Sequence, residues 1–262
     1  MWLDFLSLEY ALVGLAVGLI VGLTGVGGGS LMTPILTGVF HIPPAVAVGT
    51  DLVFAAVTKG VGTAVHGLTK TVQWRAVLWL LAGSIPAALL ALAWLHAYGT
   101  PDAQLNKLIK QMVGVSVLAT VVALIFRGRA VEWLRAHPSA QLSERNRLIA
   151  LVAGGVVLGL LVTISSIGAG ALGATFLLLL HPHWRPAEVA GTDIAYAVPL
   201  TAVAGAGHFA LGTVDTALLA GLLIGSVPAI AFGSYIARAL PEKLTRTLLA
   251  IMLTFAGFKM VL

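Results

Sequence analysis

The chain has 262 residues, of which 59% are hydrophobic and 10% are charged, with a formal net charge of +5. Soluble domains carry about 25% charged residues, so 15 basic and 10 acidic side chains are too few for a soluble surface. This composition excludes an ordinary soluble enzyme and a disordered chain, and it indicates a polytopic membrane protein. Cysteine is absent, which excludes disulfides, thiolate metal sites and cysteine nucleophiles.

Ten apolar stretches, each bounded by polar residues, glycine or proline, predict ten helical segments. Most are long enough to cross a hydrocarbon core of roughly 30 Å at about 1.5 Å per residue. The second and seventh would reach only about 15–18 Å, and each follows a glycine-rich break. Numbered one to ten, the segments are Leu8–Leu23, Leu31–Phe40, Ala45–His66, Ala76–Tyr98, Leu108–Phe126, Leu148–Ile164, Ala169–Leu180, Ala187–Leu211, Thr216–Ala237 and Leu244–Leu262.

The chain also repeats itself. A shift of 142 residues places Pro44–Ala87 on Pro186–Ala229 with 17 identities in 44 positions, including the Gly-Thr-Asp triplets and His66 on His208. A shift of 141 places Gly27 and Gly29 on Gly168 and Gly170. Because polar residues and prolines match at one offset, we interpret the chain as two copies of a five-segment unit. The predicted units are 1–126 and 148–262, joined by the basic linker 127–147.

The distribution of Lys and Arg predicts the orientation. The linker, the loop 67–75, Arg185 and the loop 238–246 are basic, whereas the opposite connections 41–44, 96–106 and 212–215 have no Lys or Arg. The exceptions to this pattern are Lys107, Lys110 and Lys259. Basic loops face the cytoplasm, so we expect the linker inside and both termini outside the cell. Segments six and seven must then make an even number of crossings, and the two units are inverted. The predicted fold is all-α, with two inverted repeats, each with a short glycine-rich helical hairpin that meets the other near the membrane midplane.

The two glycine-rich breaks are the strongest candidates for a binding site. Inverted repeats with short interrupted segments at matching positions are typical of transporters, whose substrate lies where the broken helices end. The helix starts that follow the breaks offer free N–H groups and partial positive charge, which suit an anion. Neither break contains a dinucleotide or P-loop motif. The predicted substrate-binding residues of the breaks are Thr24, Gly27, Gly28, Gly29, Ser30, Ser165, Ser166, Gly168, Ala169 and Gly170.

Two aspartates occupy matched positions within the membrane. Asp51 and Asp193 each follow a Gly-Thr pair that contains Thr50 or Thr192. A central aspartate costs roughly 2.5–3.5 kcal/mol on insertion scales, so an idle role is unfavourable. Each could accept hydrogen bonds from the adjacent hairpin, carry a coupling proton, or help to bind sodium or another hard cation.

Other intramembrane groups leave alternatives open. Lys59 has Thr201 at its matched position, and it could be a counter-charge for an anion or a residue that pairs or snorkels to the interface. His66 and His208 end their segments and could be interfacial caps or proton relays. His181 and His183 flank Pro182, where a metal pair is conceivable, but we expect no metal site and no cofactor.

These residues together resemble a known family. The run Gly25-Val26-Gly27-Gly28-Gly29, a short helix with Pro34, then Gly49-Thr50-Asp51, His66 and Gly83-Ser84-x-Pro86 resemble the TauE/SafE sulfite exporter family over nearly the whole chain. The resemblance implies a bacterial or archaeal inner-membrane carrier of sulfite, thiosulfate or a small organosulfonate such as sulfoacetate. It also implies that the two hairpins meet at the substrate. The second copy departs from the pattern, with Gly168-Ala169-Gly170 after two serines.

We therefore predict a secondary exporter of a small sulfur-containing anion, driven by a proton gradient or the membrane potential. A passive anion channel is the alternative within this class. An intramembrane hydrolase using Ser30 with His66 or His208 is disfavoured because Ser30 has Ala171 as its counterpart, and a non-transporting subunit is disfavoured by the lack of an extramembrane domain. The expected partners are the anion, the lipid bilayer and protons, without nucleic acid; a homodimer is left open.

Overall fold

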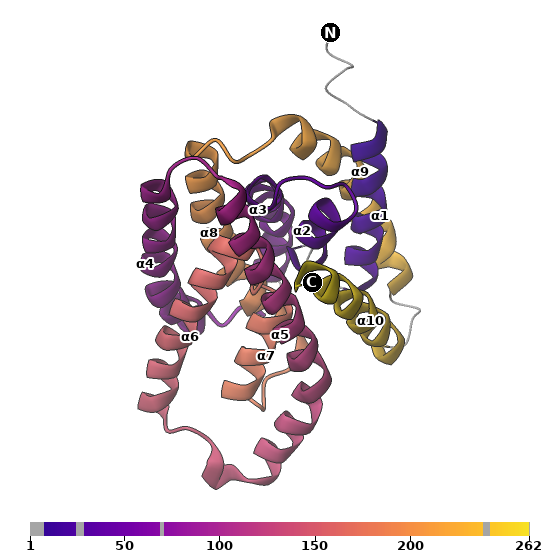
Figure 1. The fold of residues 1–262 in the computed structure, drawn as a ribbon. Coiled ribbons are helices and arrows are strands. Elements are labelled where there is room, and N and C mark those ends of the chain that lie inside the picture. The colour runs from indigo at the N-terminus through magenta and orange to yellow at the C-terminus, as the bar shows by residue number, and fades with distance from the viewer. Residues whose placement is uncertain (1–7, 25–28, 69–70, 238–241, 262) are drawn as a thin grey trace.

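The computed structural model describes residues 8–24, 29–68, 71–237 and 242–261. This part of the chain forms ten α-helices and one short 3-10 turn, and no strand occurs in it (Figure 1). The all-α fold predicted from the sequence is confirmed. The helices are α1 Leu8–Thr24, α2 Gly29–Gly38, α3 Pro44–Leu68, α4 Trp74–Tyr98, α5 Ala103–Ala136, α6 Glu144–Ser165, α7 Ala171–Leu180, α8 Pro186–Ala210, α9 Thr216–Ala237 and α10 Glu242–Val261.

Helix lengths agree with a membrane protein. Among the described residues, α4, α5, α6 and α8 are long and apolar enough to cross a bilayer. By contrast, α2 and α7 have ten residues each, or about 15 Å at 1.5 Å per residue, and are too short to cross. Large apolar side chains such as Leu90 and Phe255 are exposed on the outside, as expected where lipid replaces water.

Local residue choices explain where several helices begin. The side chain of Asp102 accepts a hydrogen bond from the Leu105 backbone N–H at 2.7 Å, which caps α5. Ser143 caps α6, and Pro186 occupies the first turn of α8. The clearest boundary difference is at α5, which continues through Ala136 instead of ending at Phe126. Most of the expected linker 127–147 is therefore helical.

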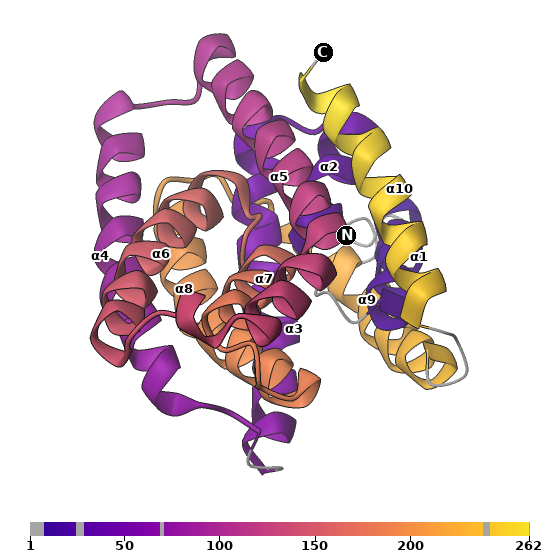
Figure 2. The same cartoon turned by 90° about the horizontal axis from the view of Figure 1, so that it is seen from below.

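The helices of the two sequence copies are interleaved. The N-terminal α1 packs against α9, and α6 packs against α4, so each pair combines helices from both copies (Figures 1 and 2). Small residues allow these backbones to approach closely. A Cβ atom added at Gly14 would overlap the Leu222 carbonyl oxygen, and one added at Gly155 would overlap that of Leu80. The two contacts match each other, because Gly14 corresponds to Gly155 and Leu80 corresponds to Leu222 at the offsets of 141 and 142 residues.

The helices that carry the candidate site lie between these outer pairs. Helix α3 packs against α8, and each also contacts the short helix of its own copy, α2 or α7 respectively. Helix α5 contacts both α10 and α7. The short helices are thereby held next to α3 and α8, and the polar residues of α3 and α8 face the glycine-rich break that precedes α7.

Candidate functional site

The second glycine-rich break is a tight, buried loop between α6 and α7. Three of its residues have positive φ angles: Ser166 at 59°, Gly168 at 135° and Gly170 at 142°. Glycine adopts the wide positive values without a side-chain clash, which accounts for the two glycines. The loop is closed by hydrogen bonds from the Gly173 N–H to the Gly168 carbonyl and from the Ala174 N–H to the Gly170 carbonyl, at 2.8 and 2.7 Å.

Three ionisable side chains are buried around this loop. Asp51, Asp193 and Lys59 are 0%, 4% and 7% exposed. The Lys59 ammonium donates a hydrogen bond of 2.6 Å to the Ala169 carbonyl oxygen, in the middle of the loop. Lys59 also lies within electrostatic reach of both carboxylates, and its interaction with Asp193 is the stronger. One ammonium group therefore links α3 to the second break, with two acidic residues nearby.

The Asp51 carboxylate joins the first hairpin to the second. Its Oδ2 accepts a hydrogen bond of 2.7 Å from the Thr33 hydroxyl of α2. On the other side it faces Ser166 of the second break. Neither Asp51 Oδ1 nor the Ser166 hydroxyl has a hydrogen-bond partner, although both atoms are buried. Both atoms are therefore able to take part in a further hydrogen bond.

The Asp193 carboxylate lies against the start of α7. A Cβ atom added at Gly173 would overlap Asp193 Oδ1, and the Gly170 backbone N–H faces the same carboxylate. Tyr196 is three residues further along α8, so its side chain lies on the same helix face. The Tyr196 hydroxyl faces the Ser84 hydroxyl of α4. Both oxygens are buried, as is Asp193 Oδ1, and none of the three has a hydrogen-bond partner.

Unpartnered buried polar atoms are rare in folded proteins, and each requires an explanation such as a bound ligand, ion or water. Here three of them lie beside the second break, namely Asp51 Oδ1, Ser166 Oγ and Asp193 Oδ1, and two more, Tyr196 Oη and Ser84 Oγ, face each other between α8 and α4. Together with the Lys59 ammonium, they supply one cationic donor, hydroxyl donors and carboxylates that can hold protons. Such a set can bind a small oxygen-rich solute and exchange protons with it.

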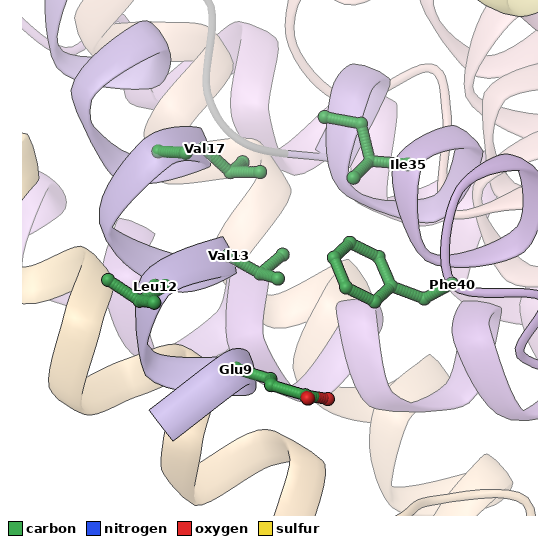
Figure 3. A pocket seen from close by; sticks show the side chains of 7 residues that line it. Glu9, Leu12, Val13, Val17, Ile35 and Phe40 are labelled. Atoms are coloured by element: carbon green, nitrogen blue, oxygen red, sulfur yellow. The ribbon is translucent and has the colours of Figure 1, made fainter. Parts of the chain in front are cut away.

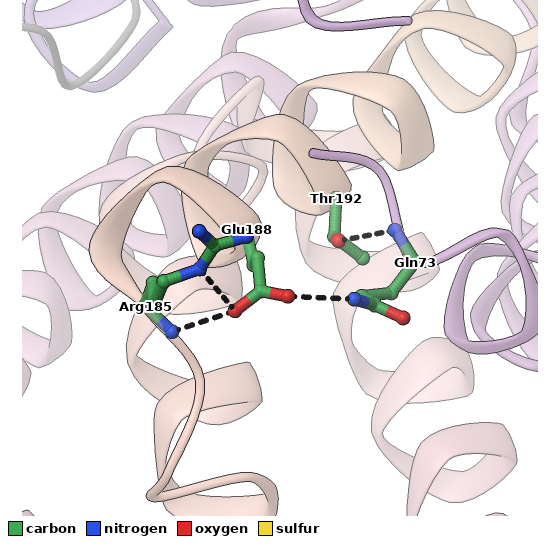
Figure 4. Close-up of polar contacts among 4 residues, drawn as sticks. All are labelled: Gln73, Arg185, Glu188 and Thr192. Atoms are coloured by element: carbon green, nitrogen blue, oxygen red, sulfur yellow. Dashed lines mark hydrogen bonds and ion pairs between the residues drawn. The ribbon is translucent and has the colours of Figure 1, made fainter. Parts of the chain in front are cut away.

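The threonines that precede the aspartates have a different role. The Thr50 hydroxyl accepts a hydrogen bond of 3.0 Å from the backbone N–H of Asp215, in the α8–α9 connection. At the matched position, the Thr192 hydroxyl accepts a hydrogen bond of 3.0 Å from the backbone N–H of Gln73, in the α3–α4 connection (Figure 4). Each threonine thus binds a loop of the other copy rather than a hairpin.

The α3–α4 connection has an additional polar clamp. The Gln73 side chain donates to the Glu188 carboxylate at 2.9 Å, and Glu188 also pairs with Arg185 at 3.3 Å (Figure 4). At the matched place beyond α8, Asp215 instead caps α9 by accepting from the Ala217 and Leu218 N–H groups. Among the described residues, this side-chain clamp is therefore found in the α3–α4 connection and not in the α8–α9 connection.

Two other predicted residues lie apart from the buried charges. Ser165 donates to the Leu161 carbonyl oxygen at 2.6 Å and accepts from the Ile167 N–H, so it shapes the break. His208, at the far end of α8, contacts the Thr213 hydroxyl at 2.8 Å and the Thr163 carbonyl oxygen at 3.0 Å. A cavity of about 20 Å³ beside His208 can hold one water molecule.

Some predicted residues fall outside the described part of the structure. These are Gly27 and Gly28, together with the side chains of Thr24, Ser30 and His66. Gly29 begins α2. Within the described residues, no group of three or more histidine, aspartate or glutamate side chains lies where it could hold a metal ion, and the histidines at 181 and 183 are no exception.

Three residues of the site were not among the candidates predicted from the sequence. Thr33 had no charge or motif to mark it, and its contact with Asp51 depends on how α2 folds back. Tyr196 was detectable because it lies three residues after Asp193 in a helix. Ser84 was noticed only as part of the repeated Gly-Ser-x-Pro pattern.

A separate cavity of about 400 Å³ lies between α1 and α2 (Figure 3). Its lining is apolar except for Glu9, whose carboxylate would repel an anion. The side chains of Val13, Ile35 and Phe40 point into it. This cavity has none of the donors found around the second break, so we do not assign the anion site to it.

Comparison with known proteins identifies the family. The sequence model of the family described as sulfite exporter TauE/SafE matches residues 10–260. The chain belongs to this family. It is therefore a membrane transporter, and its apolar helices agree with a multi-pass protein of the inner membrane.

Curated relatives carry the same general description. The chain is 35% identical over 98% of its length to the probable membrane transporter protein YjnA of Bacillus subtilis, all of which is covered. It is 25% identical to the probable membrane transporter protein YdhB of the same organism, covering 94% of this chain and 96% of the relative. A probable membrane transporter protein of Methanocaldococcus jannaschii is 26% identical, covering 74% of this chain and 68% of the relative. No solved structure matches the chain.

Proposed function

We propose that this chain is a secondary transporter that exports a small sulfur-containing anion, such as sulfite, thiosulfate or an organosulfonate like sulfoacetate. The observation that carries the proposal is the buried Lys59 ammonium on the Ala169 carbonyl, surrounded by polar atoms without partners. A sulfur oxyanion could replace Ala169 as the acceptor of the Lys59 hydrogen bond. Its remaining oxygens would take hydrogen bonds from the Ser166 and Tyr196 hydroxyls. No step of this proposal requires a chemical reaction or a cofactor.

The charges of the site suggest how transport is driven. Two ionised carboxylates and one ammonium sum to −1, which repels an anion in a buried place. Protonation of one aspartate makes the site neutral and admits the anion, so proton and anion movements become linked. We assign this role to Asp51, because its Oδ1 is buried without a hydrogen-bond partner and its carboxylate faces Ser166 of the second break. The membrane potential, negative inside, adds to anion efflux.

We further propose that the two sequence copies, 1–126 and 148–262, are inverted repeats whose hairpins move against each other around the anion. The matched glycine contacts at Gly14 and Gly155 support a two-fold relation between the copies. So do the matched loop contacts of Thr50 and Thr192. In this arrangement the linker 127–147 faces the cytoplasm and both termini lie outside.

The test is flux in proteoliposomes. Sulfite, thiosulfate, sulfoacetate, sulfate and chloride are pulsed in turn, with and without a pH gradient, on wild type and Asp51→Asn. We expect saturable flux with at least one sulfur anion, and pH dependence that is lost in Asp51→Asn. Asp102→Asn is the matched control, because Asn also caps a helix and Asp102 lies outside the site.

Two results would overturn the proposal. A non-saturating, ohmic current would indicate a channel rather than a carrier. Absence of both current and radiotracer counterflow for every sulfur anion, with folded protein, would remove the substrate assignment. If pH dependence survives in Asp51→Asn while flux remains saturable, only the coupling role of Asp51 is refuted.

A further inference from the structure

The cavity between α1 and α2 is an open groove on the outer surface of the molecule. Its volume is about 400 Å³, which is within the range of small-molecule sites. Figure 3 shows Glu9 and Phe40 at one end of the groove, and Val17 and Ile35 at the other. The groove opens outward along α1, because Leu12 is 54% exposed and Glu9 is also exposed, whereas Val17 is buried.

The residues that leave this groove open differ from their counterparts in the second copy. At the offset of 141 residues, Ile35 corresponds to Phe176 and Val13 corresponds to Gly154. The Phe176 ring packs against Gly154, because a Cβ atom added at this glycine would overlap the ring. The ring thereby fills the space between α6 and α7, whereas the smaller Ile35 leaves the matched space between α1 and α2 unfilled. The groove therefore results from particular side chains and not from the helix arrangement alone.

The medium around this groove is the lipid bilayer. The chain belongs to a family of membrane transporters, and large apolar side chains are exposed on its outer surface. Because the groove lining is apolar except for Glu9, it suits a hydrocarbon chain. Between Glu9 and Val17, α1 rises about 12 Å at about 1.5 Å per residue, so the groove can hold part of one acyl chain.

Glu9 gives the groove one charged end. It lies in the first turn of α1, at the same end of the groove as Phe40 (Figure 3). Its counterpart at the offset of 141 residues is Ala150, which carries no charge. No ion pair joins Glu9 to another residue in the described part of the chain. An apolar groove that ends at a free carboxylate is complementary to a lipid whose headgroup carries an ammonium group.

We propose that this groove binds one phosphatidylethanolamine molecule of the bilayer, with an acyl chain between α1 and α2 and the headgroup ammonium at Glu9. The ammonium of this lipid donates hydrogen bonds to a carboxylate, which the trimethylated nitrogen of phosphatidylcholine lacks the N–H groups to do. Phosphatidylglycerol has a net negative charge, which a carboxylate repels. The proposal does not depend on the proposed transport function, since it concerns lipid bound to the resting protein.

The test measures lipid retained by the purified full-length chain, by native mass spectrometry. Phosphatidylethanolamine, phosphatidylcholine and phosphatidylglycerol with identical acyl chains are added in turn at equal concentrations. Ile35→Phe places in the groove the ring that the second copy has at the matched position, and Glu9→Gln removes the charge. Val13→Gly combined with Ile35→Phe also reproduces the facing glycine, and it replaces the single variant if that variant does not fold.

Two matched controls make the same chemical changes outside the groove. Ile149→Phe adds the same ring at an exposed position of α6, and Glu132→Gln removes an exposed carboxylate of α5. We expect both controls to retain lipid as the wild type does, with phosphatidylethanolamine preferred. Ile35→Phe should weaken retention about tenfold or more, because losing the burial of about two methylene groups is sufficient for that change. Glu9→Gln should reduce the preference for phosphatidylethanolamine about two- to fivefold, as for an exposed ion pair.

Three results would overturn the proposal. Unchanged retention in folded Ile35→Phe, or an equal loss in Ile149→Phe, would mean that the lipid binds elsewhere on the apolar surface. An unchanged preference in Glu9→Gln would remove the assignment of phosphatidylethanolamine. A lipid-free complex of two chains in the wild type, absent in Ile35→Phe, would mean that a second copy occupies the groove.

Discussion

Replacement of Lys59 by glutamine is the sharpest test of the buried site. Glutamine is of similar length and can still donate a hydrogen bond, but it carries no charge. In the wild type the ammonium donates to the Ala169 carbonyl oxygen at 2.6 Å, in surroundings where the side chain is 7% exposed. The variant therefore removes the positive charge of the site while it keeps much of the volume and one donor.

The expected loss follows from the strength of a charge-assisted hydrogen bond. Such bonds contribute about 1.5–3 kcal/mol, and every 1.4 kcal/mol changes a dissociation constant tenfold. If the anion takes the place of Ala169 as acceptor, Lys59→Gln should weaken its binding about 10- to 150-fold. The burial of the Lys59 side chain places the value toward the upper end of this range, because burial strengthens charge interactions.

The assay is anion binding to purified protein, followed by initial flux rates in proteoliposomes. Lys259→Gln is the matched control: Lys259 also donates to a backbone carbonyl, that of Gly38 at 2.7 Å, but it is exposed at the end of α10. We expect Lys259→Gln to bind the anion with the affinity of the wild type. If folded Lys59→Gln binds every tested sulfur anion within about twofold of wild type, Lys59 is not the counter-charge and the reasoning fails.

Two further predictions concern stability. Gly155→Ala should destabilise the protein by about 1–3 kcal/mol, because the new Cβ would overlap the Leu80 carbonyl oxygen between α6 and α4; thermal unfolding should show a clear decrease, whereas Gly60→Ala, with open space around it, should show none. His181 should make stability depend on pH: because its folded pKa is lowered from 6.5 to about 4, its contribution is full above pH 6.5 and is lost as the pH falls toward 4. His181→Asn should flatten that part of the unfolding profile, and an unchanged profile would contradict the assignment.

Much of the architecture was predictable from the sequence. Ten helices occur where apolar stretches were found, and the two shortest follow the glycine-rich breaks. Helix length and hydrophobicity are local properties, so they can be read along the chain. The positive φ angles of Gly168 and Gly170 were also implied by the choice of glycine. The end of α5 was not predicted, because charged residues after Phe126 continue a helix as readily as they begin a loop.

The partners of individual polar residues were less predictable. Thr50 and Thr192 were grouped with the aspartates beside them, yet their hydroxyls bind loops that are more than 100 residues away in sequence. Ser165 and Ser166 are adjacent and chemically identical, but the first shapes the break and the second faces Asp51. The backbone of Ser166 is in the left-handed region, with φ at 59°, so the two side chains point in different directions. A hydrophobicity pattern does not predict this conformation.

The sequence alone determined that this is an all-α membrane protein with glycine-rich breaks and buried charges, because composition and segment length need no knowledge of contacts. Only the tertiary structure decided that α1 packs against α9 and α6 against α4, and that Lys59 meets the carbonyl of Ala169. Those contacts depend on the angles and distances at which helices cross. They are decided by side-chain packing over the whole molecule rather than by residues near one another in the chain.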